Sequence, residues 1–207
     1  MKKLFIGLLL TSILISCNNQ KKETPKTETQ PIIEKQTKPS FDEALYQKKG
    51  KEIAMATFKV FKGHIQKVAS TQGLPAVVDF CNKKAIQLTD SMAQANNVII
   101  KRTSHKLRNE KNAPDAAQKE ILDTYLKAQK EGQALKPIVK KDKDGYVHFY
   151  GPIKLKHECL KCHGQPEKDI SPAIYKVIKE KYPNDQATGF KVGDLRGIWD
   201  IKFLEKK

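Results

Sequence analysis

The chain has 207 residues, and its 39 lysines and arginines outnumber its 23 aspartates and glutamates, which leaves a formal net charge of +16. This length suits one domain with short appendages. So large a positive charge suggests nucleic-acid binding, but an export signal opens the chain and no basic, aromatic RNA-binding motif follows, so we exclude nucleic acid as a partner. The lysines instead favour solubility and attraction to anionic headgroups or to an acidic redox protein.

The N-terminal segment has the features of an export signal. Lys2 and Lys3 form a basic start, residues 4–15 are an apolar stretch, and LISC ends at Cys17. The apolar stretch is too short to span a bilayer comfortably, so a cleaved signal peptide is favoured over a retained transmembrane helix. We predict a lipoprotein signal peptide over residues 1–16, with Cys17 as the lipidated N-terminus that anchors the chain in a membrane.

The segment after the lipidation site indicates location and a tether. Asn18 stands where an aspartate would signal retention at the inner membrane in some bacteria, so the outer membrane is slightly favoured, and we expect the protein on the periplasmic side of the cell envelope. In residues 17–40 the large apolar residues are Ile32 and Ile33, too few to bury. This segment is predicted to be a disordered tether, followed by one folded domain over residues 41–207.

Two helices are expected at the start of this domain. Large apolar residues recur at helical intervals over residues 41–65 with no proline among them, which predicts a long first helix. Gly73 and Pro75 interrupt the pattern. A second apolar helical face then runs through residues 74–88 and includes Cys81, so the second helix is expected to turn Cys81 inward.

A strand and a third helix are expected next. The β-branched residues within Val98–Thr103 favour a strand. A turn-rich loop, RNEKNAPD, follows this strand. Pro114 and Asp115 at its end are typical of a helix start, and Lys130 and Gly132 are typical of a helix end.

The C-terminal third is predicted to contain a hairpin, a helix and a last strand. Asp144-Gly145 is a hairpin turn signal between strands over residues 137–141 and 146–150. Residues 171–182 have a helical pattern, and residues 193–204 alternate as a strand does. The predicted fold class is therefore α+β, with helices around a small antiparallel sheet.

The strongest motif is CLKCH, which runs from Cys159 to His163. Two thiols at this spacing can both form thioether bonds with haem vinyl groups while the adjacent histidine binds the iron. Export agrees with this, because c-type haem is attached outside the cytoplasm. We predict one covalent c-type haem on Cys159 and Cys162, with His163 as the proximal iron ligand.

Two other kinds of site use similar residues. His157, Cys159, Cys162 and His163 are plausible zinc ligands, but structural zinc usually joins two ligand pairs from separate stretches, and these residues all lie close together in the sequence. A thioredoxin-like redox motif expects a helix that opens at the cysteines, which the following GQP at residues 164–166 does not favour. Haem attachment fits the segment better than either.

The iron needs a sixth ligand or an open position. The count of cysteines favours Cys81. Cys17 is predicted to carry lipid, and Cys159 and Cys162 to carry haem. Cys81 would otherwise be a free thiol, which is prone to oxidation in an exported protein. The other interpretation is that Cys81 is a small buried hydrophobic residue, and spacing alone does not decide between the two. The candidate ligands are Cys81, Met55, Met92, His64, His105, His148 and His157.

Four motifs occur in a characteristic order: VVDFCNKKA around Cys81, RTSHKLRNEKNAPD over residues 102–115, CLKCHG, and GDLRG over residues 193–197. Together they resemble a family of bacterial c-type haem domains with a PAS-like fold, whose cyanobacterial members carry a single haem ligated by His and Cys. The resemblance spans roughly residues 41–203. It implies a central sheet that cradles the haem, His163 as the proximal ligand and Cys81 as the distal ligand.

Three further residues follow from the resemblance. His105 stands where an apolar residue is expected after RTS, which makes it an alternative distal ligand or a hydrogen-bond donor. Arg102 and Arg108 match positions of the family and are candidates to pair with haem propionates, because guanidinium binds carboxylate in a bidentate way. The other interpretation is that both are surface arginines.

Three classes of function remain. Electron transfer needs only a haem of suitable potential, which a thiolate ligand would lower. A redox or gas sensor would respond at Cys81, and we expect its signal to pass to a separate partner protein. A peroxidase-like enzyme needs an open iron position and an acid–base group such as His105. We favour an electron-transfer protein rather than an enzyme, with a sensor second and a peroxidase last.

Overall fold

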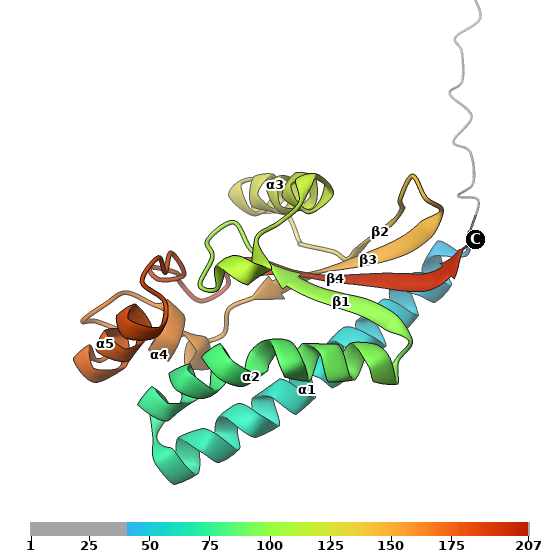
Figure 1. Cartoon of the computed structure of the whole chain (residues 1–207). Coiled ribbons are helices and arrows are strands. Elements are labelled where there is room, and N and C mark those ends of the chain that lie inside the picture. The colour runs from blue at the N-terminus through green and yellow to red at the C-terminus, as the bar shows by residue number, and fades with distance from the viewer. Residues whose placement is uncertain (1–40, 207) are drawn as a thin grey trace, which may run out of the picture. The chain divides into compact units, whose positions relative to one another are not determined.

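The computed structural model describes residues 41–206. The predicted signal peptide over residues 1–16, the lipidation site at Cys17 and the tether lie outside these residues and stay predictions. Within the described part the fold is α+β, as predicted, with a four-stranded antiparallel sheet and helices against both of its faces (Figure 1).

Two long helices open the domain. Helix α1 spans Glu43–Gln72 and helix α2 spans Leu74–Ala95. Asp42 caps α1, because its side chain accepts a hydrogen bond from the backbone N–H of Leu45 at 3.0 Å. Gly73 separates the helices with a φ of 82°, a left-handed conformation that favours glycine. Both predicted helices and the break between them are confirmed.

The sheet has the strand order β1-β4-β3-β2, so the last strand in sequence lies inside the sheet. Its strands are β1 (Val98–Thr103), β2 (Ile138–Lys141), β3 (Tyr146–Lys154) and β4 (Leu195–Lys206). The predicted strands are confirmed, and β3 continues beyond its predicted end at residue 150. Because β4 pairs with β1, Trp199 lies opposite Arg102. The pairing brings the GDLRG and RTS segments together.

Helix α3 (Ala116–Lys130) covers the sheet face opposite α1 and α2 (Figure 1). It begins with a capping box, in which Asp115 and Gln118 each accept a hydrogen bond from the other's backbone N–H. The predicted start after Asp115 is confirmed. Gln118 also donates from Nε2 to Oδ2 of buried Asp200 at 2.7 Å, which ties the helix to β4.

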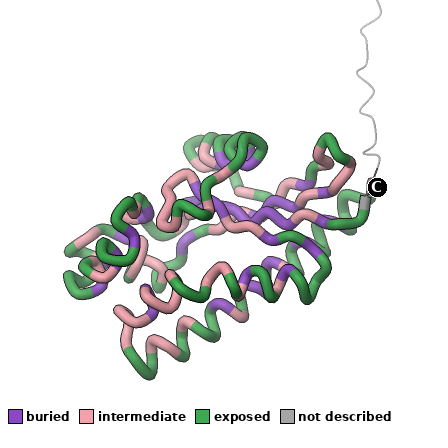
Figure 2. The backbone as a smooth tube through the Cα atoms, in the orientation of Figure 1, coloured by how far each residue is buried: buried purple, intermediate pink, exposed green. Residues whose placement is uncertain are grey.

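The middle of strand β4, residues 198–201, is buried on both faces, whereas an antiparallel strand commonly exposes one. Trp199 and Ile201 pack in the core with residues of α1 and α2, while Ile198 packs in the core of α3. Figure 2 shows the buried residues gathered along the sheet and the inner faces of the helices. Gly50 of α1 lies so close to the sheet that an added Cβ would overlap the ring of Phe149.

The remaining helices are short. They are the 3₁₀ turns η1 (Glu110–Asn112) and η2 (His157–Cys159), helix α4 (Leu160–His163) and helix α5 (Pro172–Lys181). Ser171 caps α5, which confirms the predicted helix at residues 171–182. No helix within residues 41–206 is long and apolar enough to cross a membrane.

Candidate functional site

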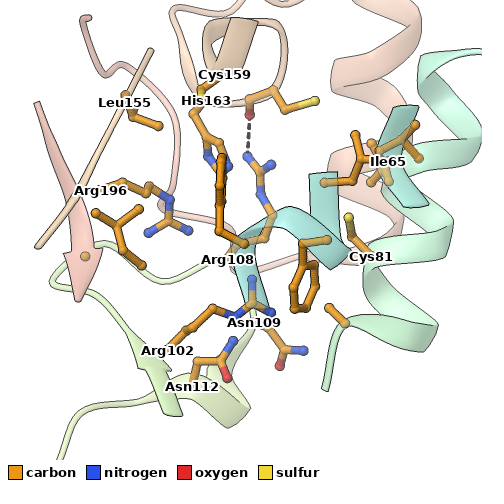
Figure 3. Close-up of a pocket in the computed structure, with 18 of the residues that line it drawn as sticks. Ile65, Cys81, Arg102, Arg108, Asn109, Asn112, Leu155, Cys159, His163 and Arg196 are labelled. Carbon is orange, nitrogen blue, oxygen red and sulfur yellow. Dashed lines mark hydrogen bonds between the residues drawn. The ribbon is translucent and has the colours of Figure 1, made fainter. Parts of the chain in front are cut away.

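A cavity of about 370 Å³ lies between α1 and α2, the ends of β1 and β4, and the CLKCH segment. Cofactor pockets typically measure about 300–1,000 Å³. Figure 3 shows side chains from these elements converging on the cavity. Its lining includes all of the site residues predicted within the described part except His105, namely Cys81, Arg102, Arg108, Cys159, Cys162 and His163.

The CLKCH segment forms consecutive helical turns. Cys159 ends η2, and α4 carries Cys162 and His163 before it ends at Gly164. Residues three apart on a helical turn lie on the same side, which agrees with both motif cysteines lining the one cavity. Both are free, partly buried thiols. The sequence did not indicate these turns, because four residues are too few to show a helical period.

His163 is oriented by a hydrogen bond to the backbone. Its Nδ1 lies 2.8 Å from the carbonyl oxygen of Ala187, which can only accept, so Nδ1 carries the proton. Burial, and then the charges of Arg196 and Arg108, hold the pKa of His163 well below its usual range, so the imidazole is neutral. A neutral imidazole with a bonded Nδ1–H leaves Nε2 free to bind a metal.

Cys81 lines the cavity from α2, a different element from the one that carries His163 (Figure 3). Burial raises the pKa of the Cys81 thiol to about 11, although the nearby charge of Arg102 opposes the increase. The prediction that α2 turns Cys81 inward is confirmed. None of the other candidate sixth ligands lines this cavity: Met55, Met92, His64, His105, His148 and His157.

Arg102 is a half-buried cation on β1. Its Cζ lies 4.1 Å from the centroid of the Phe61 ring and 5.6 Å from that of Trp199. Among residues 41–206, no hydrogen bond or ion pair involves its guanidinium, and burial lowers its pKa. Because this half-buried cation faces the cavity without a counter-charge, the cavity suits an anionic group at this point.

Arg108 also lines the cavity, but it is paired within the protein. Its guanidinium makes two bonds to the carboxylate of Asp185, at 3.0 and 3.2 Å. Arg108 is 12% exposed and Asp185 only 1%, so this is a buried ion pair. Arg108 therefore has less capacity than Arg102 to bind a further anion.

Arg196 is a cavity residue that the sequence reasoning missed. It lies on β4, and its Nη1 donates to the carbonyl oxygen of Lys106 at 3.0 Å. Burial lowers the pKa of Arg196 to about 10, and it forms no ion pair with any residue of the described chain. The GDLRG motif contains Arg196, but its position beside the cavity follows only from the pairing of β4 with β1.

His105 lies outside this cavity. It lines a separate one of about 290 Å³, together with Lys119, Asp123 and Gln186. Phe190 packs edge-on against the His105 ring at 5.9 Å between centroids, and burial lowers the pKa of His105. The structure therefore does not bring His105 together with the other predicted site residues.

The residues present fit a c-type haem. They provide paired thiols at the CxxCH spacing, a neutral imidazole with a free Nε2, and a third thiol from α2. Arg102 and Arg196 provide positive charge at the cavity without carboxylate partners, which is what two propionates require.

The fold and the cavity thus define a small α+β domain built around a CxxCH motif. The model of the Tll0287-like family matches residues 19–203, and the chain belongs to this family. The solved structure of the cyanobacterial heme-protein Tll0287 is similar, with a TM-score of 0.50 and 25% sequence identity over 74% of this chain and 97% of that one. No curated protein shows significant similarity to the chain.

Proposed function

We propose that the protein is an exported, lipid-anchored c-type cytochrome that binds one covalent haem and transfers electrons. One observation carries this proposal: a single cavity is lined by both motif cysteines, by His163 with its Nδ1 bonded to the backbone, and by Cys81 from another helix. Membership of the Tll0287-like family and the likeness to a heme-protein support haem as the ligand.

The ligand roles divide between two elements. Cys159 and Cys162 would form the thioether bonds, and His163 would bind iron through Nε2. Cys81 would be the sixth ligand as a thiolate, since coordination to a metal removes the thiol proton. When bound, the haem supplies a reversible one-electron couple between ferric and ferrous iron.

Arg102 and Arg196 would hold the propionates. Both side chains are half-buried and line the cavity, and neither forms an ion pair with a residue of the described chain. Propionates would therefore provide the missing negative charge, in the bidentate geometry that guanidinium favours. Arg108 remains a weaker candidate, because its guanidinium already binds Asp185.

Two protein ligands favour electron transfer over catalysis. A peroxidase-type enzyme needs an open iron position and an acid–base group beside it. Cys81 would fill the sixth position, and His105 lines the other cavity. We therefore infer an electron carrier and not an enzyme, one that exchanges electrons with a separate redox protein.

A redox or gas sensor is the second candidate. It is favoured by the location of Cys81 on α2 and of His163 on α4. Loss of the thiolate would release α2, while the bond to Ala187 would still hold His163. Such a change would reach a signalling partner through the surface of α1 and α2.

Spectroscopy of the protein made in a host that matures c-type cytochromes tests the ligand assignment. Cys81→Ala and Cys81→Ser should change the low-spin ferric spectrum in electron paramagnetic resonance and raise the reduction potential, because thiolate donation stabilises ferric iron. His105→Ala is the control, since His105 lies outside the cavity, and should leave both unchanged. An unshifted spectrum and potential in Cys81→Ala would overturn the assignment.

The same spectra separate the two candidate functions. In a carrier, His163 and Cys81 would both stay bound in the oxidised and reduced states, because small structural change favours rapid electron exchange. In a sensor, Cys81 would be released on reduction or on binding of a small gas. Retention of the thiolate in the reduced protein would therefore support electron transfer, and its loss would support sensing.

A further inference from the structure

Arg108 faces the cavity but directs its hydrogen bonds into the protein. Its Nε and Nη2 donate to the two carboxylate oxygens of Asp185 at 3.0 and 3.2 Å. Nη2 also donates to the carbonyl oxygen of Cys162 at 2.7 Å, the bond dashed in Figure 3, and to that of Ala187 at 3.2 Å. One guanidinium thus contacts a carboxylate and two backbone carbonyls.

These acceptors belong to the segments that surround His163. The carbonyl of Ala187 that accepts from Arg108 is the one that accepts from Nδ1 of His163. The backbone N–H of Ala187 in turn donates to Oδ1 of Asp185 at 3.0 Å. A further backbone bond joins the N–H of Phe190 to the carbonyl of His163 at 3.0 Å. The position of Ala187 therefore depends on both members of the ion pair.

We propose that Arg108 and Asp185 form a positioning pair that orients the imidazole of His163. The pair connects three segments that are far apart in sequence: the loop after β1, the CLKCH segment, and the loop that contains Ala187. It keeps the Ala187 carbonyl where it receives Nδ1–H, so that Nε2 stays available. This inference rests on the proposed function, which makes His163 an iron ligand.

The chemistry of the two side chains explains the choice of residues. Guanidinium is planar and has five N–H donors in a rigid fork, so it can serve several acceptors at once. A lysine ammonium cannot reproduce this arrangement. A buried ion pair is often no more stabilising than apolar residues of similar volume. The bonds to Cys162 and Ala187 therefore point to orientation as the role of Arg108.

The test uses a charge-neutral double variant. Arg108→Gln alone leaves the carboxylate of Asp185 buried and unpaired, which destabilises the fold itself. Arg108→Gln with Asp185→Asn removes one charge of each sign and keeps polar side chains of similar size. Arg108→Lys retains only the charge. Lys161→Gln is the control, because Lys161 is exposed on α4 beside Cys162.

The first measurement uses protein without haem. Nitrogen-15 NMR of the His163 ring reports which nitrogen carries the proton and how fast that proton exchanges. In the wild type and in Lys161→Gln we expect Nδ1–H alone. In the double variant the exchange should be about fivefold faster, which corresponds to one hydrogen bond of ordinary strength, and Arg108→Lys should be intermediate.

The second measurement titrates the same proteins with ferric protoporphyrin IX. Loss of an outer partner of a metal ligand commonly weakens binding about 10–100-fold, so the double variant should bind at least about tenfold more weakly than Lys161→Gln. A folded double variant with unchanged proton exchange would overturn the positioning pair. Failure of the wild type to bind the porphyrin would instead contradict the haem function, while the NMR result still decides the orientation of His163.

Discussion

His148 is expected to make the stability of the fold depend on pH. Its Nδ1 lies 2.7 Å from Oδ1 of Asp200 on β4, and its Nε2 lies 3.3 Å from Oδ2 of Asp142 at the hairpin turn. Tyr150 stacks on the ring, and Lys202 also binds Asp142 at 2.9 Å. Burial lowers the pKa of His148, but the hydrogen bonds and charges of Asp200 and then Asp142 outweigh burial and raise it.

The sign of the effect follows from this raised pKa. A histidine in the unfolded chain has a pKa near 6.5. Because the pKa of His148 is higher in the folded protein, protonated His148 contributes its full stabilisation below about pH 6.5 and loses it as the pH rises through the folded value.

The structure sets the size of this contribution. Hydrogen bonds to charged groups contribute about 1.5–3 kcal/mol. The bond to Asp200 is short and the His148 side chain is 13% exposed, whereas the contact with Asp142 is longer. We therefore expect about 2 kcal/mol from His148, mostly through Asp200.

Urea unfolding of the wild type and of His148→Gln over a range of about pH 5.5 to 9 measures this contribution. The difference in unfolding free energy between the two proteins should be largest at the acidic end and should shrink as the pH rises. Titrating groups that His148 does not contact are common to both proteins and cancel in the difference. A difference that is constant across the range would refute the reasoning.

Three further predictions concern the core, the anchor and the cavity. Gly50→Ala should lower the free energy of unfolding by about 1–3 kcal/mol, because the added Cβ overlaps Phe149. At Gly63 an added Cβ meets nothing within 4 Å, so Gly63→Ala should raise the free energy of unfolding slightly in the same urea assay. Cys17→Ser should abolish labelling by a fatty-acid probe and release the protein from membranes, and unchanged labelling would contradict the lipidation site. Arg102→Leu should weaken porphyrin binding, because it removes a cation that faces the cavity without a carboxylate partner; equal binding would argue against a propionate contact.

Long elements could be predicted from the sequence because local signals agree along them. The helices α1 and α2 have apolar residues at helical intervals and a glycine between them, and the start of α3 has its capping residue Asp115. The sheet order could not be predicted, since the place of β4 between β1 and β3 depends on pairing between residues distant in sequence. Helix α4 was missed because it is only one turn long.

The candidate site also contains residues that the local sequence indicated and residues that it did not. Cys159, Cys162 and His163 form one local motif, and the count of cysteines indicated Cys81. Arg196 and Asp185 gave no local signal, because their roles follow from contacts with the loop after β1.

The place of His105 did not follow from its neighbours in the sequence. His105 stands three residues after Arg102 in the sequence, but β1 ends at Thr103 and the chain turns there. At this point Oγ of Ser104 donates a hydrogen bond to the carbonyl oxygen of Arg196 at 2.5 Å, and the next residue, His105, lines the second cavity. Proximity in sequence to a cavity residue therefore did not indicate a place in the cavity.

The central claim, one covalent haem on the CLKCH motif, is tested most directly by the mass of the intact, denatured protein after expression with a cytochrome-maturation system. We predict that the wild type carries the mass of one haem through denaturation and that Cys159→Ser with Cys162→Ser carries none. A wild-type mass without haem, or a haem retained by the double variant, would contradict the claim.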